Sequence, residues 1–174
     1  MALKQTLKLE HGLGEWYSLT PANTAALHPR PGTPTALAPL FPDGVLDLEY
    51  EPTYYPSRKG ETLQDLHDRA ELFLAAFLAR IEAEHPHVRT VMLFGHAASV
   101  IALGRALTGE KTLEVVAGCG SVTMYGRKAG DEGGGIGGWD VKRMGMVDHL
   151  EKGVERNWSV RPPCDSNPME GPSV

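Results

Sequence analysis

The sequence feature that most restricts the fold is the apolar run Val91–Phe94, which ends at Gly95-His96 and precedes a segment with helical periodicity. A continuous apolar run is typical of a strand that is buried on both faces of a sheet, and we predict this strand over residues 88–94. In open α/β sheets, ligands bind in the crevice outside the carboxyl ends of such strands. We therefore predict an α/β fold in which His96 faces a ligand-binding crevice.

Length and charge restrict the class of protein. The 174 residues, 41% of them hydrophobic, are enough for one domain with its own core. A formal net charge of −5 argues against direct nucleic-acid binding and requires a local cationic pocket for any anionic partner. No apolar segment approaches the ~20 residues of a membrane span. We expect no membrane contact, and a cytoplasmic or nuclear protein.

The two cysteines and the histidines do not form a pattern that is typical of a metal site. Cys119 and Cys164 lie far apart in the chain, and the second is in a proline-rich tail. His85 and His87 are only two residues apart with a proline between them, which is a poor spacing for ligands of one metal ion. We predict no disulfide framework, no metal site and no cofactor.

Two helices are predicted from local signals. Thr62 is followed three residues later by Asp65, which is a capping-box pattern for the start of a helix. Apolar residues then recur at steps of three and four as far as Ile81, and His85-Pro86 ends the helix. After His96, Ala97–Leu107 has a second helical pattern, and Gly109 is a suitable C-terminal cap.

The rest of the chain gives weaker signals. Residues 3–10 allow a short strand, and residues 20–42 contain six prolines that predict a long covering loop, with a helical turn at residues 23–27. Residues 120–125 and 139–144 alternate well enough for an antiparallel hairpin, joined by a glycine-rich connection.

The end of the chain differs in composition from the rest. From Arg161 onward the residues are mostly Pro, Ser, Asn and Gly, a composition typical of disorder. We therefore predict a domain over residues 1–160 and a disordered tail over residues 161–174.

Three motifs in order along the chain resemble the phosphoglycerate-mutase-like histidine phosphatase superfamily. They are the loop Glu-His-Gly-Leu-Gly-Glu-Trp that begins at Glu10, the segment Gly60-Glu61-Thr62 with Arg69 on the next helix, and Phe94-Gly95-His96. The resemblance covers about residues 7–126. It implies an α/β fold of three layers, with helices on both faces of one sheet.

The resemblance also implies roles for individual residues. Glu10 would be the general acid that protonates the departing oxygen of a phosphomonoester, and His96 would hold the phosphoryl group, because an imidazolium donates hydrogen bonds to phosphate oxygens. His11 and Ala97, which adjoin these two residues, would contact the substrate. The partners of such a domain would be a phosphorylated small molecule or a phosphoprotein.

The sequence departs from the family at its most important point. It contains no Arg-His-Gly triplet, which carries the family's nucleophilic histidine on the first central strand, and it lacks the second arginine of the following helix. Loss of one member of a concerted nucleophilic unit can lower the rate by roughly six orders of magnitude. We expect a domain that lacks the first central strand, has no phosphatase activity, and leaves Val91–Phe94 unpaired unless the sheet closes up or a partner supplies a strand.

An alternative to an inactive phosphatase domain is a non-catalytic interaction subunit. The segment Asp148-His149-Leu150-Glu151-Lys152-Gly153, followed by Trp158, resembles a fungal branch of the same family. That branch includes the small subunit of RNA polymerase III transcription factor IIIC. Trp16, Tyr54, Tyr55 and the proline-rich loop would then form a contact surface for a protein partner. An unrelated α/β protein with chance motif matches is the third interpretation.

Overall fold

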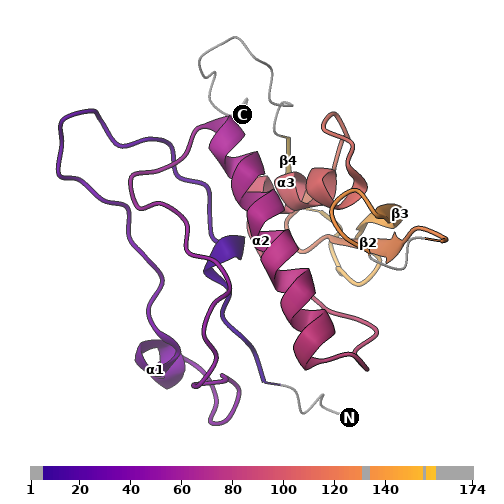
Figure 1. Ribbon diagram of the computed structural model, residues 1–174, viewed down its shortest axis with the longest axis horizontal. Coiled ribbons are helices and arrows are strands. Elements are labelled where there is room, and N and C mark those ends of the chain that lie inside the picture. Colours follow the sequence, from indigo (N-terminus) through magenta and orange to yellow (C-terminus); the bar gives the residue numbers. More distant parts are fainter. Residues whose placement is uncertain (1–5, 131–133, 155, 160–174) are drawn as a thin grey trace.

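The computed structural model describes residues 6–130, 134–154 and 156–159. The longest helix, α2 (Leu63–Glu84), runs through the centre of the molecule, as Figure 1 shows. Residues 6–60 lie to one side of it, and helix α3 (Ala97–Thr108) and the strands lie to the other. None of the described helices is both long and apolar enough to cross a membrane. The predicted disordered tail, residues 161–174, lies outside the described residues.

Helix α2 begins and ends where the sequence predicts. The Thr62 hydroxyl accepts a hydrogen bond from the Asp65 backbone N–H at 3.1 Å, and the Asp65 carboxylate accepts one from the Thr62 N–H at 2.9 Å. This reciprocal capping box satisfies two of the helix's orphan donors. The helix ends at Glu84, immediately before His85-Pro86.

The core lies between α2 and α3. Each helix contributes one apolar stripe, and small residues on α3 let the two backbones approach closely. The buried cluster consists of Leu66, Ala70, Phe73, Leu74 and Phe77 from α2 with Ala98, Ala102, Leu103 and Ala106 from α3. Burial of each large side chain in this cluster is worth about 1.5–3 kcal/mol.

Helix α3 confirms the second predicted helix. Gly109 has a φ of 74°, in the left-handed region, and its N–H donates to the Arg105 carbonyl at 2.9 Å. Glycine adopts this conformation without a Cβ penalty, so the helix ends there. At the other end, His96 is the N-cap residue with extended backbone, and its side chain makes no capping hydrogen bond.

The described strands form two antiparallel sheets of two strands each. Strands β2 (Val122–Arg127) and β3 (Trp139–Met146) pair as a hairpin, which confirms that prediction. Strands β1 (Ala117–Gly118) and β4 (Asn157–Trp158) form the other sheet. The fold is therefore a mixed α/β fold. The described strands do not form the single larger sheet of the predicted three-layer arrangement.

The predicted buried strand at Val91–Phe94 is wrong in this structure. The segment has no regular secondary structure, and its four side chains are 38–71% exposed. Apolar composition favours a strand, but a strand forms only against a neighbour that supplies the ladder hydrogen bonds, and no described segment does so here. The strand predicted within residues 3–10 is reduced to one parallel bridge between Leu7 and Leu46, and residues 1–5 lie outside the described residues.

The proline-rich region is irregular, as its composition predicts, but its helical turn is not where we expected it. Residues 23–27 are not helical, and a short helix α1 (Pro34–Leu37) continues into the 3-10 turn η2 (Ala38–Leu40). Thr33 caps α1 by accepting from the Ala36 N–H at 3.2 Å, and Pro34 suits the first helical position.

Backbone hydrogen bonds hold this region together near the start of α2. The N–H of Thr20 donates to the Lys59 carbonyl at 2.8 Å, and the N–H of His28 donates to the Arg58 carbonyl at 2.7 Å. Gly60 allows the close approach of the two segments, since its φ is 86° and a Cβ there would lie 2.2 Å from the Ser18 carbonyl oxygen. The loop is therefore fixed beside the residues of the candidate site.

Candidate functional site

The three sequence motifs converge around a buried ion pair. Arg69 of α2 donates from Nε to Glu61 Oε1 at 2.8 Å, and from Nη1 to the carbonyls of Gly12 and Gly14 at 2.7 and 3.2 Å. The side chains of Arg69 and Glu61 are 2% and 7% exposed. Ser99 of α3 donates its hydroxyl to the same Gly14 carbonyl at 2.6 Å. Arg69 thus connects two parts of the chain, the loop that follows Glu10 and the segment at the start of α2.

Close packing also fixes this loop, which contains the 3-10 turn η1 (His11–Leu13). A Cβ at Gly12 would lie 2.3 Å from Cδ2 of Phe73, so only glycine fits against the core there. The indole N–H of Trp16 donates to the Glu61 backbone carbonyl at 3.0 Å. Burial raises the pKa of Glu61, and the Arg69 guanidinium opposes that shift.

Glu10, the predicted general acid, is held by residues 50–53 of the covering region. Its carboxylate accepts hydrogen bonds from the Tyr50 and Thr53 hydroxyls and from the Thr53 N–H at 2.8 Å. Burial, followed by the hydrogen bond to Glu10, raises the pKa of Tyr50 to about 12. Three donors therefore hold this carboxylate in place, and Glu10 is not among the residues that line the cavity described below.

His96, the predicted phosphate ligand, faces Glu15 instead of Glu10. Its Nδ1 lies 3.0 Å from Glu15 Oε2, and the two side chains are 55% and 41% exposed. Ala97, the predicted substrate contact beside it, packs against the buried cluster of Ile101, Val115 and Ala117. The position of His96 at the N-terminus of α3 therefore follows from the sequence, whereas its pairing with Glu15 does not.

His11, the other predicted substrate contact, is buried against the covering region. Its ring centroid lies 4.9 Å from that of Tyr55, and its Nδ1 has no hydrogen-bond partner among the described residues. Burial lowers the pKa of His11, and the charge of Arg30 lowers it further. The imidazole is therefore neutral near pH 7, with one buried ring nitrogen unsatisfied.

His11 and His96 both line one cavity of about 390 Å³ beneath the covering region. Its wall also contains Arg30 and Arg58, which sequence reasoning missed. Arg30 donates to the Pro56 carbonyl at 3.2 Å and Arg58 to the His28 carbonyl at 3.0 Å, and neither pairs with a carboxylate of the described residues. The cavity wall thus carries two arginines together with the carboxylates of Glu15 and Glu61. The remaining lining residues are Gly14, Glu15, Tyr17, His28, Pro29, Pro31, Pro56, Ser57, Gly60 and Glu61.

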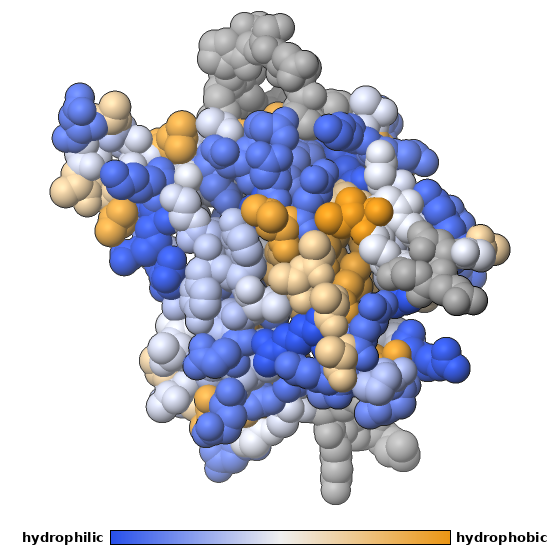
Figure 2. Space-filling view, in the orientation of Figure 1, coloured by the Kyte–Doolittle hydropathy of each residue, from blue (hydrophilic) through white to orange (hydrophobic). Residues whose placement is uncertain are grey.

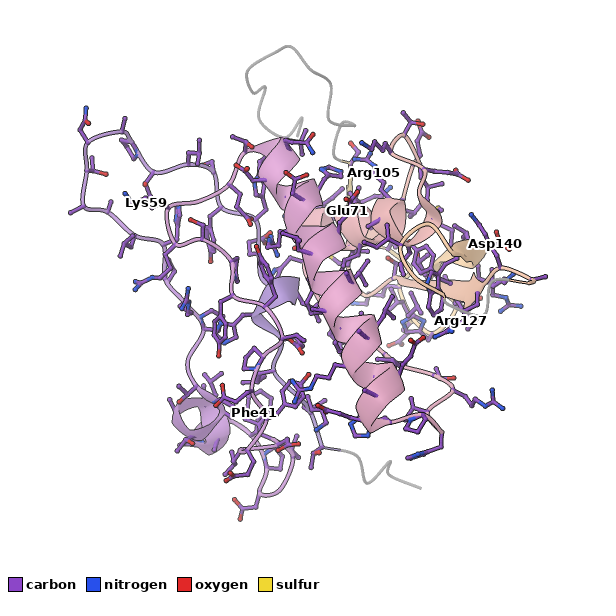
Figure 3. The ribbon with its side chains drawn as sticks, viewed as in Figure 1. Phe41, Lys59, Glu71, Arg105, Arg127 and Asp140 are labelled. Carbon is purple, nitrogen blue, oxygen red and sulfur yellow. The ribbon has the colours of Figure 1, made fainter. Side chains whose placement is uncertain are left out.

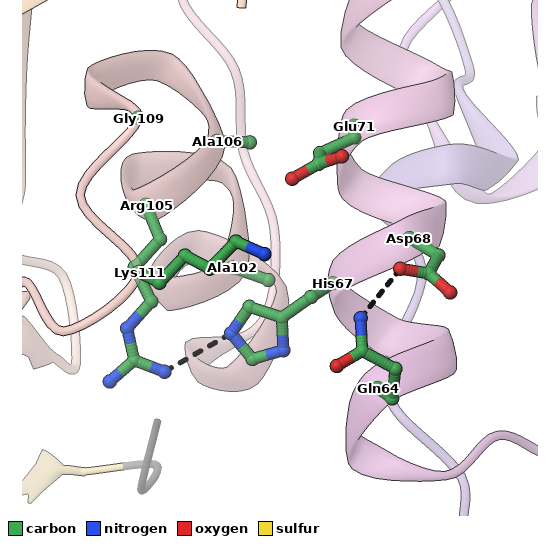
Figure 4. Close-up of a pocket in the computed structure, with 9 residues that line it drawn as sticks. All are labelled: Gln64, His67, Asp68, Glu71, Ala102, Arg105, Ala106, Gly109 and Lys111. Atoms are coloured by element: carbon green, nitrogen blue, oxygen red, sulfur yellow. Dashed lines mark hydrogen bonds between the residues drawn. The ribbon is translucent and has the colours of Figure 1, made fainter. Parts of the chain in front are cut away.

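A second, smaller cavity of about 80 Å³ lies between α2 and α3, as Figure 4 shows. His67 Nδ1 donates to the Leu63 carbonyl at 2.8 Å, so its Nε2 is the acceptor for Arg105 Nη1 at 3.1 Å. Burial lowers the pKa of both His67 and Arg105. No sequence signal indicates this pair, which joins the two helices.

Comparison with known proteins finds similarity to a transcription factor subunit over part of the chain. No family model matches the chain. Over 101 residues it is 41% identical to the "Transcription factor tau 55 kDa subunit" of Saccharomyces cerevisiae. The match covers 58% of this chain and 22% of the relative, so the chain matches only about a fifth of the relative's length. These comparisons do not identify the histidine phosphatase superfamily.

Proposed function

We propose that this chain is a protein-binding subunit of a transcription factor assembly of the transcription factor IIIC type and works in the nucleus. The observation that carries this proposal is the 41% identity over 101 residues to a yeast transcription factor subunit. Identity at this level over more than half of the chain supports a shared fold and a shared kind of role. The match covers 22% of that relative, so we propose assembly into a complex for this chain by analogy with it.

The covering region, residues 17–60, supplies a suitable contact surface. Several of its apolar side chains are exposed, among them those of Leu19 (56%), Leu27 (49%) and Leu40 (76%), and backbone hydrogen bonds hold the region in place. Figure 2 shows apolar side chains on this part of the surface as separate groups among polar ones, the mixture that protein interfaces have. In Figure 3 the side chains of Phe41 and Lys59 mark two ends of the region.

The predicted aromatic contact residues contribute unequally to this surface. Tyr55 is 46% exposed and remains a candidate contact. Trp16 and Tyr54 are packed against the α2–α3 core, so their main role is structural. The surface that we propose is therefore centred on the leucines of the covering region.

We also propose that the domain is related to the histidine phosphatase superfamily and is catalytically inactive, although its described strands do not form the single sheet of that family's three-layer fold. The convergence of the three motifs on the N-terminal ends of α2 and α3 supports this origin. In this proposal Glu10 and His96 occupy the family's acid and phosphate-binding positions. The hydroxyls of Tyr50 and Thr53 hold Glu10, and the sequence contains no Arg-His-Gly triplet that would supply the family's attacking histidine.

Binding of a phosphate monoester without turnover is a second candidate function, favoured by the two arginines of the cavity, which bond only backbone carbonyls of the described residues. Inorganic phosphate titrated into the ¹⁵N-labelled chain should shift the Arg30 and Arg58 side-chain resonances. The variants R30Q and R58Q should lose this binding, and R143Q, on the exposed strand β3, should keep it. Equal binding by all variants would remove the cavity from consideration.

Purification of the tagged chain from nuclear extract tests the main proposal. We expect mass spectrometry to find transcription factor IIIC subunits in near-stoichiometric amounts. The variant L27D/L40D should lose them, whereas L72D, which alters an equally exposed leucine on α2, should keep them. Absence of these subunits would refute the proposal, as would aryl phosphate hydrolysis that E10A and H96A abolish.

A further inference from the structure

Two threonines of the sequence precede a proline, no serine does, and the fold holds these two threonines differently. The two pairs are Thr20-Pro21 and Thr33-Pro34. Thr20 is half-buried, and its N–H donates to the Lys59 carbonyl at 2.8 Å, near the start of α2. Thr33 is exposed and has extended backbone, with φ −63° and ψ 158°, because a following proline disfavours the helical region.

The segment around Thr33 can open without disturbing the core. Helix α1, which follows Thr33, buries none of its four residues, and Figure 1 shows it at the edge of the molecule. A single helical turn has little stability of its own, since isolated helices shorter than about 12–15 residues are marginal in water. The Thr33 hydroxyl accepts one hydrogen bond, from the Ala36 N–H at 3.2 Å, and donates none to the described residues. Local opening therefore gives another protein access to this hydroxyl and to the residues after it.

We propose that Thr33 is a phosphorylation site for a proline-directed protein kinase. Such a kinase selects proline after the acceptor residue, because any other residue there would bring a backbone N–H that finds no partner in the complex. The Thr33 Oγ1 atom forms a bond to the γ-phosphorus of ATP. The bond between that phosphorus and the β–γ bridging oxygen breaks, which releases ADP, and the hydroxyl proton passes to the catalytic aspartate of the kinase.

A phosphate on Thr33 would have a cation within reach. Arg30 lies three residues earlier, donates to the Pro56 carbonyl at 3.2 Å and pairs with no carboxylate of the described residues. The prolines at positions 29 and 31 favour the polyproline II conformation, in which residues three apart share a face. A phosphothreonine carries a charge of about −1.5 to −2 near pH 7 and forms charge-assisted hydrogen bonds with arginine. The modified side chain should therefore pair with Arg30, which lines the larger cavity.

This inference does not depend on the proposed function, because the purified chain, a kinase and ATP are enough to test it. The folded full chain is incubated with an active cyclin-dependent kinase and Mg-ATP, and mass spectrometry locates the phosphate. We expect it on Thr33. T33A should lose the incorporation, and T20A should keep it. P34A should also lose it, although this variant retains the acceptor hydroxyl, and circular dichroism establishes that each variant is folded.

The pairing with Arg30 has its own measurement. In the ¹⁵N-labelled chain, phosphorylation should shift the Arg30 Nε–H resonance, and the Nε–H resonance of Arg143, on the exposed strand β3, should stay in place. An unchanged Arg30 resonance in the phosphorylated chain would overturn the pairing. Absence of phosphate from Thr33, equal incorporation into T33A or P34A, or preferential modification of Thr20 would overturn the assignment of the site.

Discussion

Replacement of Arg69 by methionine should be among the most destabilising single changes in this chain. Methionine keeps most of the volume of the arginine stem but leaves the Glu61 carboxylate, 7% exposed, without its cation. Removal of one partner from a buried ion pair costs about 3–5 kcal/mol. The Gly12 carbonyl loses its donor as well, whereas the Gly14 carbonyl keeps the Ser99 hydroxyl. These losses share one network and do not add, so we expect about 3–5 kcal/mol in total.

Urea unfolding followed by far-UV circular dichroism measures this loss. It is a large part of the roughly 5–15 kcal/mol that a domain of this size has. The double variant R69M/E61Q should recover part of the stability, because the buried charge is then removed. K142M, which breaks an exposed pair with Asp140, should cost at most about 1 kcal/mol. A loss below about 1 kcal/mol for R69M, or strict additivity with E61Q, would refute the assigned role of Arg69.

Three further predictions concern the cap, pH and catalysis. T62A removes one half of the capping box of α2 and should lower the free energy of unfolding by about 1 kcal/mol in the same urea assay. An unchanged free energy of unfolding would contradict the capping role of Thr62. Burial lowers the pKa of His67 below 6.5, so the unfolded chain takes up that proton first as the pH falls. The contribution of His67 to stability should be complete above pH 6.5 and fall as the pH drops from 6.5 toward the folded-state pKa. The variant H67Q should reduce this dependence of stability on pH. An unchanged pH dependence would contradict the assigned role of His67. The chain should hydrolyse no aryl phosphate above the rate of E10A/H96A, and a higher rate for the unmodified chain would contradict the proposed loss of catalysis.

The elements that the sequence predicts correctly are those whose signals are local. The start of α2 depends on Thr62 and Asp65, three residues apart, and the end of α3 depends on Gly109 alone. The hairpin of β2 and β3 joins neighbouring segments through one glycine-rich connection. In each case the residues that determine the element lie within or beside it, so no knowledge of distant contacts is needed.

Predictions that required distant partners were less successful. Hydrophobicity alone indicated a buried strand at Val91–Phe94, but the neighbouring strand is not present among the described segments. The motif residues Glu61 and Arg69 were identified, yet their ion pair spans eight residues and binds a loop more than fifty residues away. Arg30 gave no signal, because only the folded covering region places it beside His11.

The central claim is that this chain is a bound, non-catalytic subunit, and sedimentation of nuclear extract through a glycerol gradient tests it most directly. The account predicts that the chain sediments with the subunits of the transcription factor IIIC complex. L27D/L40D should then move it to the position of the free chain. Sedimentation of the unmodified chain only at the position of the free chain, in extract where the complex is intact, would contradict the account.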